Sequence, residues 1–237
     1  MPKINKENMK IYSKEEIAKI EEAAQIAVYA LTKIREYVKE GMTTLELDEL
    51  CNNFIVEKGG VSACKGYKVL ENKESYPRYT CISVNNCLCH GIPSKDIILQ
   101  NGDIVNIDIT VKKDGYYGDT SQMYVVGKTS KKNLDLIEHT YQCMMKGIEA
   151  AIVGNNIGDV GVAIEKYIKQ NTSYAIEKGY VGHGIGDKFH DAPNVYHYDA
   201  SVENIKTQKI VNGMCFTVEP IIKERNVKTF ITSEGWQ

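Results

Sequence analysis

The sequence predicts an α+β fold built from two related halves. Each half contains two amphipathic helices separated by a glycine, and strand-like runs follow. The landmarks Ser13 and Ser130 lie 117 positions apart, and Gly41 and Gly154 lie 113 apart. Such matched spacings favour an internal duplication over the ordinary alternation of helices and strands in α+β proteins. We therefore expect one domain over residues 1–237, with pseudo-symmetric halves at about 13–127 and 130–237 and antiparallel strands covered by helices.

The helices of the first half are predicted from capping residues and apolar spacing. Ser13 and Glu16 form a capping box, after which apolar residues recur at helical spacing as far as Val38. Thr43 or Thr44 can cap a second helix. The runs "TCISVNN" and "DIVNIDITV" then read as strands, because they are rich in β-branched and apolar residues.

The second half repeats this order. A helix follows Ser130 and ends at Gly154, and a second helix carries apolar residues from Ile157 to Ile168. The glycine-rich "GYVGHGIG" comes next, and "MCFTVEPII" follows as an apolar strand. The repeat logic calls for one more strand, which the sequence does not reach before Gln237. We therefore expect the second half to be incomplete.

Bulk composition excludes several classes of function. The net charge of −2 gives no electrostatic reason to bind nucleic acid or an anionic membrane. The polar N-terminus does not resemble a signal peptide, and no apolar run approaches the roughly 20 residues that span a bilayer. Seven irregularly spaced cysteines are typical of reduced thiols. These features predict a cytoplasmic protein, and no exposed apolar stripe calls for a partner, so we expect a monomer.

Two aspartates in adjacent strands are the strongest sign of chemistry. A two-residue turn at Asp114-Gly115 pairs Thr110 with Asp119 and places Asp108 diagonally from Asp119 on one polar face. Diagonal neighbours lie roughly 7–8 Å apart at the backbone, so two ionised carboxylates there repel each other. A divalent cation converts this conflict into binding energy, and two bridged cations would lie roughly 3.5–4 Å apart. The alternative is a solvated hairpin, which the surrounding apolar residues disfavour.

The histidines and a third acid in a predicted strand, Glu219, are further candidate ligands. His183 lies between glycines in "GHGIG", and Glu219 lies in "FTVEP", where a buried glutamate needs a partner. Imidazole and carboxylate together suit Mn, Fe, Co or Zn. His90 and His190 are candidates for substrate contacts or metal ligation. The histidines whose surroundings indicate structural roles are His139 and His197.

Other motifs give weak or no support to competing sites. "GHGIG" lacks the preceding strand and following helix of a phosphate-binding loop. Cys87-x-Cys89-His90 has no second pair at the spacing of a structural zinc site. The sequence contains neither the HExxH motif of metalloproteases nor the GxSxG elbow of serine hydrolases.

The motifs "CHGIPS", "GDIVNIDITV", "GYYGDTSQM", "GHGIGDKFHDAP" and "FTVEPII" together resemble the type I methionine aminopeptidases, over nearly the whole chain. The resemblance implies the duplicated pita-bread fold and a centre with two divalent metal ions. It also implies removal of the initiator methionine from nascent polypeptides by a metal-activated water. Such an enzyme would meet its substrates at or near the ribosome.

The resemblance also implies roles for individual residues. Asp108 would chelate one metal ion, Asp119 would bridge both, and His183 and Glu219 would bind the second. His90 would lie near the substrate amine and the scissile peptide, and His190 would contact the scissile carbonyl. The residues that would line the methionine pocket are Cys64, Tyr67, Tyr76, Cys81, Phe189 and Trp236.

Three departures from the family pattern bear on activity. Asp187 occupies a position where the family usually has arginine, and Lys68 to Ser75 form an insertion that could reshape the rim of the pocket. The family's last strand carries a second glutamate that bridges both metal ions, and this sequence ends before it. The chain is then either a truncated enzyme or an inactive relative that binds peptides or the ribosome. A Xaa-Pro peptidase is a third alternative, which "CHGIP" and "KFHDAP" disfavour.

Overall fold

The computed structural model describes residues 9–68, 74–232 and 236. The chain divides into two compact units. Unit 1 combines Met1–Ile17 with Lys132–Lys228, and unit 2 combines Ala18–Lys131 with Thr229–Gln237. Within the described residues, no helix has the length and apolarity needed to cross a membrane.

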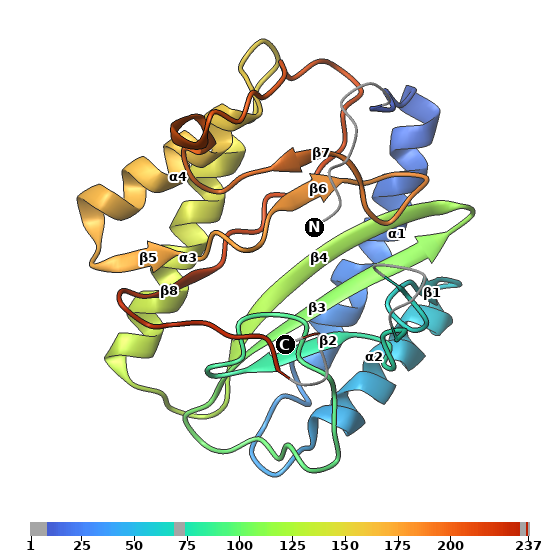
Figure 1. Cartoon of the computed structure of the whole chain (residues 1–237). Helices are drawn as coiled ribbons and strands as arrows, with labels where there is room; N and C mark the ends of the chain where they lie inside the picture. The colour runs from blue at the N-terminus through green and yellow to red at the C-terminus, as the bar shows by residue number, and fades with distance from the viewer. Residues whose placement is uncertain (1–8, 69–73, 233–235, 237) are drawn as a thin grey trace. The chain divides into compact units, whose positions relative to one another are not determined.

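Unit 2 is an antiparallel sheet packed against two helices. Its elements are α1 (Lys14–Ile34, whose first turn belongs to unit 1), α2 (Thr44–Glu57), β1 (Val61–Ser62), β2 (Cys81–Val84), β3 (Ile104–Lys113) and β4 (Tyr116–Val125). β3 pairs with β4 along one edge and with β1 and β2 along the other. The long β3–β4 hairpin is green in Figure 1, and α1 is blue. Fully buried residues such as Ile34, Leu47 and Ile107 join both helices and the sheet in one core.

The capping and turn signals of the first half are confirmed, but α1 ends at Ile34 and not at Val38 as predicted. The Ser13 hydroxyl accepts a hydrogen bond from the Glu16 N–H, and the Glu16 carboxylate accepts one from the Ser13 N–H. Thr43, rather than Thr44, caps α2 with its own capping box. Asp114 and Gly115 have φ values of 48° and 86°, as a type I′ turn requires.

Asp48 on α2 ties the helix to the loop that enters β2. Its side chain is fully buried and accepts hydrogen bonds from the Thr80 N–H and hydroxyl, both at 2.8 Å, and from the Tyr79 N–H at 3.3 Å. Burial raises the pKa of the Asp48 carboxyl, and these hydrogen bonds oppose that rise. Asp48 thereby fixes the residues that immediately precede Cys81.

We expect Asp48→Asn to lower the free energy of unfolding by about 1–2 kcal/mol, because the amide group presents a donor to backbone N–H groups that need acceptors. Urea denaturation measures this change. Glu49→Gln on the same helix is the control, since Glu49 is exposed and the change should have little effect. Equal stability of the two variants would contradict the anchoring role of Asp48.

Unit 1 places two helices beside two small antiparallel sheets. Its elements are α3 (Lys131–Ala150, whose first residue belongs to unit 2), α4 (Gly158–Asn171), β5 (Tyr174–Ile176), β6 (Gly182–Gly184), β7 (Asp191–Val195), the short 3₁₀ helix η1 (Ala200–Glu203) and β8 (Ile222–Glu224). β5 pairs with β8, and β6 pairs with β7. Figure 1 shows α3 and α4 side by side. The core of unit 1 joins both helices through residues such as Cys143 and Ile164.

The prediction that "MCFTVEPII" forms one continuous strand is wrong in the extent of the strand. The segment is extended, but it pairs with β6 only through an isolated bridge between Phe216 and Gly184, and a regular strand begins at Ile222. Pro220 lacks an N–H group, so it cannot donate in a continuous ladder. Glu219 therefore lies outside a regular strand, and its side chain is 47% exposed rather than buried.

Candidate metal and substrate site

The β3–β4 hairpin holds Asp108 and Asp119 in the predicted register. Asp108 lies opposite Ser121, and Thr110 lies opposite Asp119, so the two acids are diagonal neighbours on one face. Both aspartates are half-buried, whereas Ile107 on the other face is fully buried. The hairpin thus presents two carboxylates on a rigid scaffold whose opposite face is anchored in the core.

His183 and Glu219 form a second pair, in unit 1. His183 is 6% exposed on β6, and its Nδ1 lies 3.0 Å from the carbonyl oxygen of Gly184. A carbonyl can only accept, so Nδ1 carries the proton and Nε2 is left with a lone pair. Nε2 lies 3.5 Å from Oε1 of Glu219. A lone pair facing a carboxylate calls for a proton or a cation between them, so this donor pair fits a divalent metal ion.

Aromatic rings cluster beside His183. The His190 ring centroid lies 4.1 Å from that of His183 and 4.1 Å from that of Phe189, on which it stacks. His190 is exposed and Phe189 is half-buried. Unit 1 therefore brings together four of the predicted site residues: His183, Phe189, His190 and Glu219.

Unit 2 groups His90 with the residues predicted for the methionine pocket. The Trp236 ring lies 5.2 Å from the Tyr76 ring and 6.4 Å from the His90 ring, edge-on to both. Tyr76 is 2% exposed, and its hydroxyl donates to the carbonyl of Gly91 at 2.8 Å. Burial lowers the pKa of His90, while the Trp236 backbone and the charge of Asp119 oppose that shift. These contacts make a largely apolar surface with a neutral imidazole at its edge.

Two buried cysteines extend this apolar surface. Cys81 lies directly opposite Asp108 across the β2–β3 pair. A hydrogen bond with Cys64, and then burial, raise the pKa of the Cys81 thiol, which keeps it protonated. Tyr67 is half-buried, and its backbone bonds to those of Cys64 and Tyr76. The insertion Lys68 to Ser75 lies between Tyr67 and Tyr76, and residues 69–73 lie outside the described part of the chain.

The structure thus assembles the predicted ligands as two pairs, one in each unit. Among the described residues, no group of three or more His, Cys, Asp or Glu side chains is gathered as a metal site. The convergence of Asp108, Asp119, His183 and Glu219 on common metal ions therefore stays a prediction.

Two residues that hold Glu219 are not among the predicted site residues. His197, predicted to be a loop residue with a structural role, is 2% exposed, and its Nε2 accepts a hydrogen bond from the Glu219 N–H at 3.1 Å. The Thr217 hydroxyl donates to Oε1 of Glu219 at 2.5 Å. The alternation of Thr217 and Glu219 in "FTVEP" is a signal for Thr217 alone, and the sequence gives none that links His197 to Glu219. His139 has a structural contact, because its Nδ1 lies 2.9 Å from the Tyr167 hydroxyl.

Asp187 binds the segment that precedes α1. Lys10 Nζ lies 3.0 Å from Oδ2 of Asp187, and the Tyr12 hydroxyl donates to Oδ1 at 3.0 Å. The same hydroxyl accepts from the Asp187 N–H at 3.2 Å. Because Asp187 lies between His183 and His190 in sequence, these contacts anchor the loop that joins them.

We expect a double-mutant cycle of Tyr12→Phe and Asp187→Ala to give a coupling free energy of about 1 kcal/mol at pH 7, since the pair is only partly buried. Lys10 chiefly, together with Tyr12, lowers the pKa of the Asp187 carboxyl. Because this pKa is lower in the folded than in the unfolded chain, the ionised carboxylate stabilises the fold at pH values above the ordinary aspartate pKa. That stabilisation is lost as pH falls through the folded-state pKa. Denaturation at pH 7 and pH 3 should therefore show the coupling shrinking in acid, and a coupling that grows would contradict the assignment.

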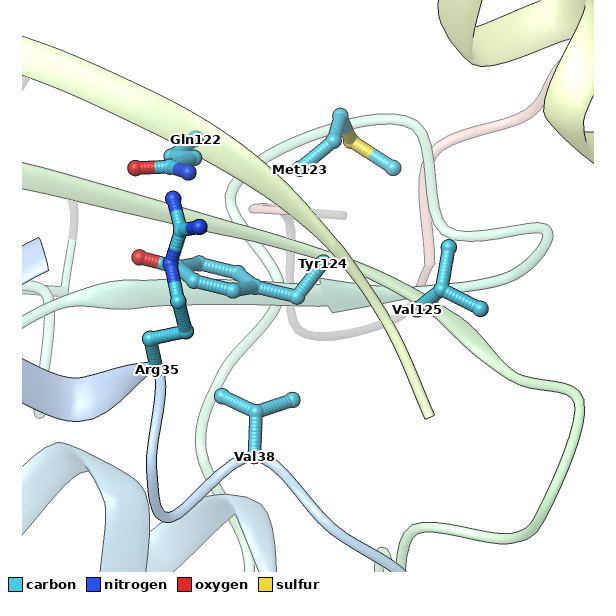
Figure 2. Close-up of a pocket in the computed structure, with 6 residues that line it drawn as sticks. All are labelled: Arg35, Val38, Gln122, Met123, Tyr124 and Val125. Atoms are coloured by element: carbon cyan, nitrogen blue, oxygen red, sulfur yellow. The ribbon is translucent and has the colours of Figure 1, made fainter. Parts of the chain in front are cut away.

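A pocket of about 260 Å³ lies elsewhere in unit 2. Figure 2 shows Arg35 reaching toward Gln122 beside the ring of Tyr124. The other lining residues are Val38, Met123 and Val125. None of the predicted site residues lines this pocket, so it is separate from the candidate site.

Comparisons with known proteins agree on one family. A model of metallopeptidase family M24 matches residues 18–236. The methionine aminopeptidase of Rickettsia prowazekii is 41% identical over 229 residues, which are 96% of this chain and 84% of that protein. The methionine aminopeptidase of Escherichia coli K12 is 39% identical over 227 residues, with coverages of 95% and 82%.

Solved structures give the same picture. The crystal structure of methionine aminopeptidase from Rickettsia prowazekii has a TM-score of 0.89 at 41% identity, over 97% of this chain and 88% of that one. The enzyme from Thermotoga maritima has a TM-score of 0.88 at 28% identity, with the same coverages. The prolidase of Pyrococcus furiosus has a TM-score of 0.68 at 22% identity, over 90% of this chain and 60% of that one, which speaks for the fold alone.

Proposed function

Because the chain belongs to metallopeptidase family M24, we propose that its function is the removal of methionine from the N-terminus of polypeptides. The relatives at about 40% identity are methionine aminopeptidases, and they match over some 95% of the chain. The pita-bread fold of the family agrees with the helices and antiparallel sheets of both units. The enzyme class is that of a metal-dependent exopeptidase.

We propose that Asp108, Asp119, His183 and Glu219 hold two divalent metal ions, of Co, Mn, Fe or Zn. The diagonal carboxylates on β3 and β4, and the Nε2 of His183 facing Glu219, support this assignment. When bound, the metal ions supply activation of water near neutral pH and polarisation of the scissile carbonyl. The single observation that carries the proposal is the orientation of His183, whose Nδ1–H is donated to Gly184 so that Nε2 carries the lone pair and faces Glu219.

The remaining residues are proposed to bind and orient the substrate. His90, with its lowered pKa, is neutral at pH 7 and can exchange a proton or hydrogen bond near the substrate amine. His190 is proposed to donate a hydrogen bond to the scissile carbonyl, where negative charge develops. The proposed lining of the methionine pocket is apolar and rich in sulfur and rings, which suits a thioether side chain: Cys64, Tyr67, Tyr76, Cys81, Phe189 and Trp236.

We propose that the enzyme acts in the cytoplasm, on the basis of its substrate and of its cysteine thiols. Nascent polypeptides carry the N-terminal methionine, so the enzyme would act at or near the ribosome. None of the seven cysteines, all of which lie in the described part of the chain, forms a disulfide, which supports a reducing compartment such as the cytoplasm. We propose a monomer.

Hydrolysis of a Met-Ala-Ser peptide tests the activity. We expect turnover of the metal-free chain only after Mn²⁺ or Co²⁺ is added, and loss of turnover when a chelator is added. A peptide with leucine in place of methionine should react far more slowly, because the pocket is assigned to a thioether. Absence of turnover with every metal ion, together with no metal uptake, would instead support an inactive peptide-binding member of the family.

A further inference from the structure

We propose that Thr217 and His197 are positioning residues that hold Glu219 ready to receive a metal ion. This inference rests on the proposed function, because it takes Glu219 to be a ligand. Two residues outside the ligand set would thus affect metal affinity through their contacts with Glu219.

Thr217 links the two ligands of unit 1 through a single hydroxyl. The hydroxyl oxygen accepts from the His183 N–H at 3.0 Å, and its proton is donated to Oε1 of Glu219 at 2.5 Å. The Thr217 N–H also donates to the His183 carbonyl at 2.9 Å, so the two segments are joined at both the backbone and the side chain. A shift of either ligand would therefore break a hydrogen bond to Thr217.

His197 fixes the backbone of Glu219 through a separate hydrogen bond. Its ring is 2% exposed, and its Nε2 accepts from the Glu219 N–H at 3.1 Å. A ring nitrogen that accepts must carry a lone pair, so the proton of the neutral ring is on Nδ1. His197 and Glu219 lie 22 positions apart in sequence, so this contact joins the segment after β7 to the segment before β8.

These contacts matter because the Glu219 side chain is only half-buried. With 47% of its side chain exposed, a glutamate has several accessible rotamers, and holding it in one of them costs conformational entropy. The hydrogen bonds from Thr217 and to His197 select one arrangement before the metal ion arrives, so less entropy is lost on binding. Partners of this kind typically change metal affinity by about 10–100-fold.

Matched substitutions at Thr217 separate positioning from packing. Valine has nearly the shape of threonine but no hydroxyl, whereas serine keeps the hydroxyl and loses a methyl group. At His197, leucine removes the acceptor, whereas glutamine places an amide oxygen near the position of Nε2. If the two residues act by positioning, Thr217→Ser and His197→Gln should keep affinity that Thr217→Val and His197→Leu lose.

Isothermal titration of the metal-free full chain with Mn²⁺ is the test, with thermal unfolding by circular dichroism to confirm that each variant folds. We expect the Kd for Mn²⁺ to rise about tenfold or more in Thr217→Val and His197→Leu, and to change less than about threefold in Thr217→Ser. Glu219→Gln is the reference, and it should weaken binding at least as much. If His197→Leu does not fold, the pair at Thr217 decides the result.

Two outcomes would overturn the inference in distinguishable ways. If Glu219→Gln weakens binding but Thr217→Val binds as tightly as the wild type, the positioning role is wrong and the ligand assignment stands. If Glu219→Gln binds as the wild type does, or the wild type takes up no Mn²⁺, the proposed metal site fails, and the inference fails with it.

Discussion

Asp108→Asn is expected to lower kcat/KM for a Met-Ala peptide by about a thousandfold or more while the chain stays folded. Neutralising a carboxylate ligand removes a charge that holds the metal ion, and about 4 kcal/mol of lost transition-state stabilisation corresponds to this factor. The fold should survive because the core depends on the opposite face of β3, where Ile107, Ile109 and Val111 are fully buried.

The same substitution should slightly stabilise the metal-free chain. Asp108 and Asp119 are diagonal neighbours on a half-buried face, so two ionised carboxylates repel there when no cation lies between them. Removing one charge relieves the repulsion, and a residue that lowers stability but supports activity is typical of a functional site. Denaturation of the metal-free proteins should therefore show Asp108→Asn to be at least as stable as the wild type.

Asp114→Asn is the matched control on the same hairpin. Asp114 lies exposed in the turn with a φ of 48°, a conformation that asparagine adopts as readily as aspartate. This variant should keep wild-type kcat/KM. Near wild-type turnover by Asp108→Asn would show that Asp108 is not a ligand, and equal losses in both variants would point to a general electrostatic effect.

The hairpin could be predicted because residues close together in sequence determine its turn and its register. The alternation of polar and apolar residues along β3 and the Asp114-Gly115 turn together determine which residues share a face and which lie opposite. The capping boxes of α1 and α2 are local in the same sense. The convergence of the two ligand pairs is not local, and it rests on the family resemblance.

The features that the sequence did not predict depend on contacts between segments that lie far apart in the sequence. The exposure of Glu219 and its hydrogen bond to His197 follow from how the segments after β7 and before β8 meet. No periodicity within either segment carries that information. Asp187 is similar, since its partner Lys10 lies 177 positions away in sequence. An isolated motif therefore offers candidate ligands, whereas their surroundings depend on contacts that no motif contains.

Gly118 is a point of close approach between α1 and β4, next to the proposed ligand Asp119. A Cβ atom added to Gly118 would lie 2.1 Å from the N atom and 2.4 Å from the Cα atom of Ala24, and 2.6 Å from the carbonyl carbon of Ala23. All three are backbone atoms of α1, so no side-chain rotation can make room. The helix lies this close because Ala23 and Ala27, both fully buried, keep its inner face narrow.

Gly118→Ala is therefore expected to lower the free energy of unfolding by about 3 kcal/mol or more, because α1 must move away from the sheet and lose contacts along its length. Urea denaturation measures the loss, and kcat/KM should fall as well, because Asp119 moves with the strand. Gly179→Ala is the control: its added Cβ would meet only the end of the Glu177 side chain, with the nearest atom at 3.1 Å, and no backbone atom. That variant should change stability by less than about 1 kcal/mol. If Gly118→Ala were as stable as Gly179→Ala, α1 could not be packed against β4 as closely as described, and the rigid support of Asp119 would have to come from elsewhere in unit 2.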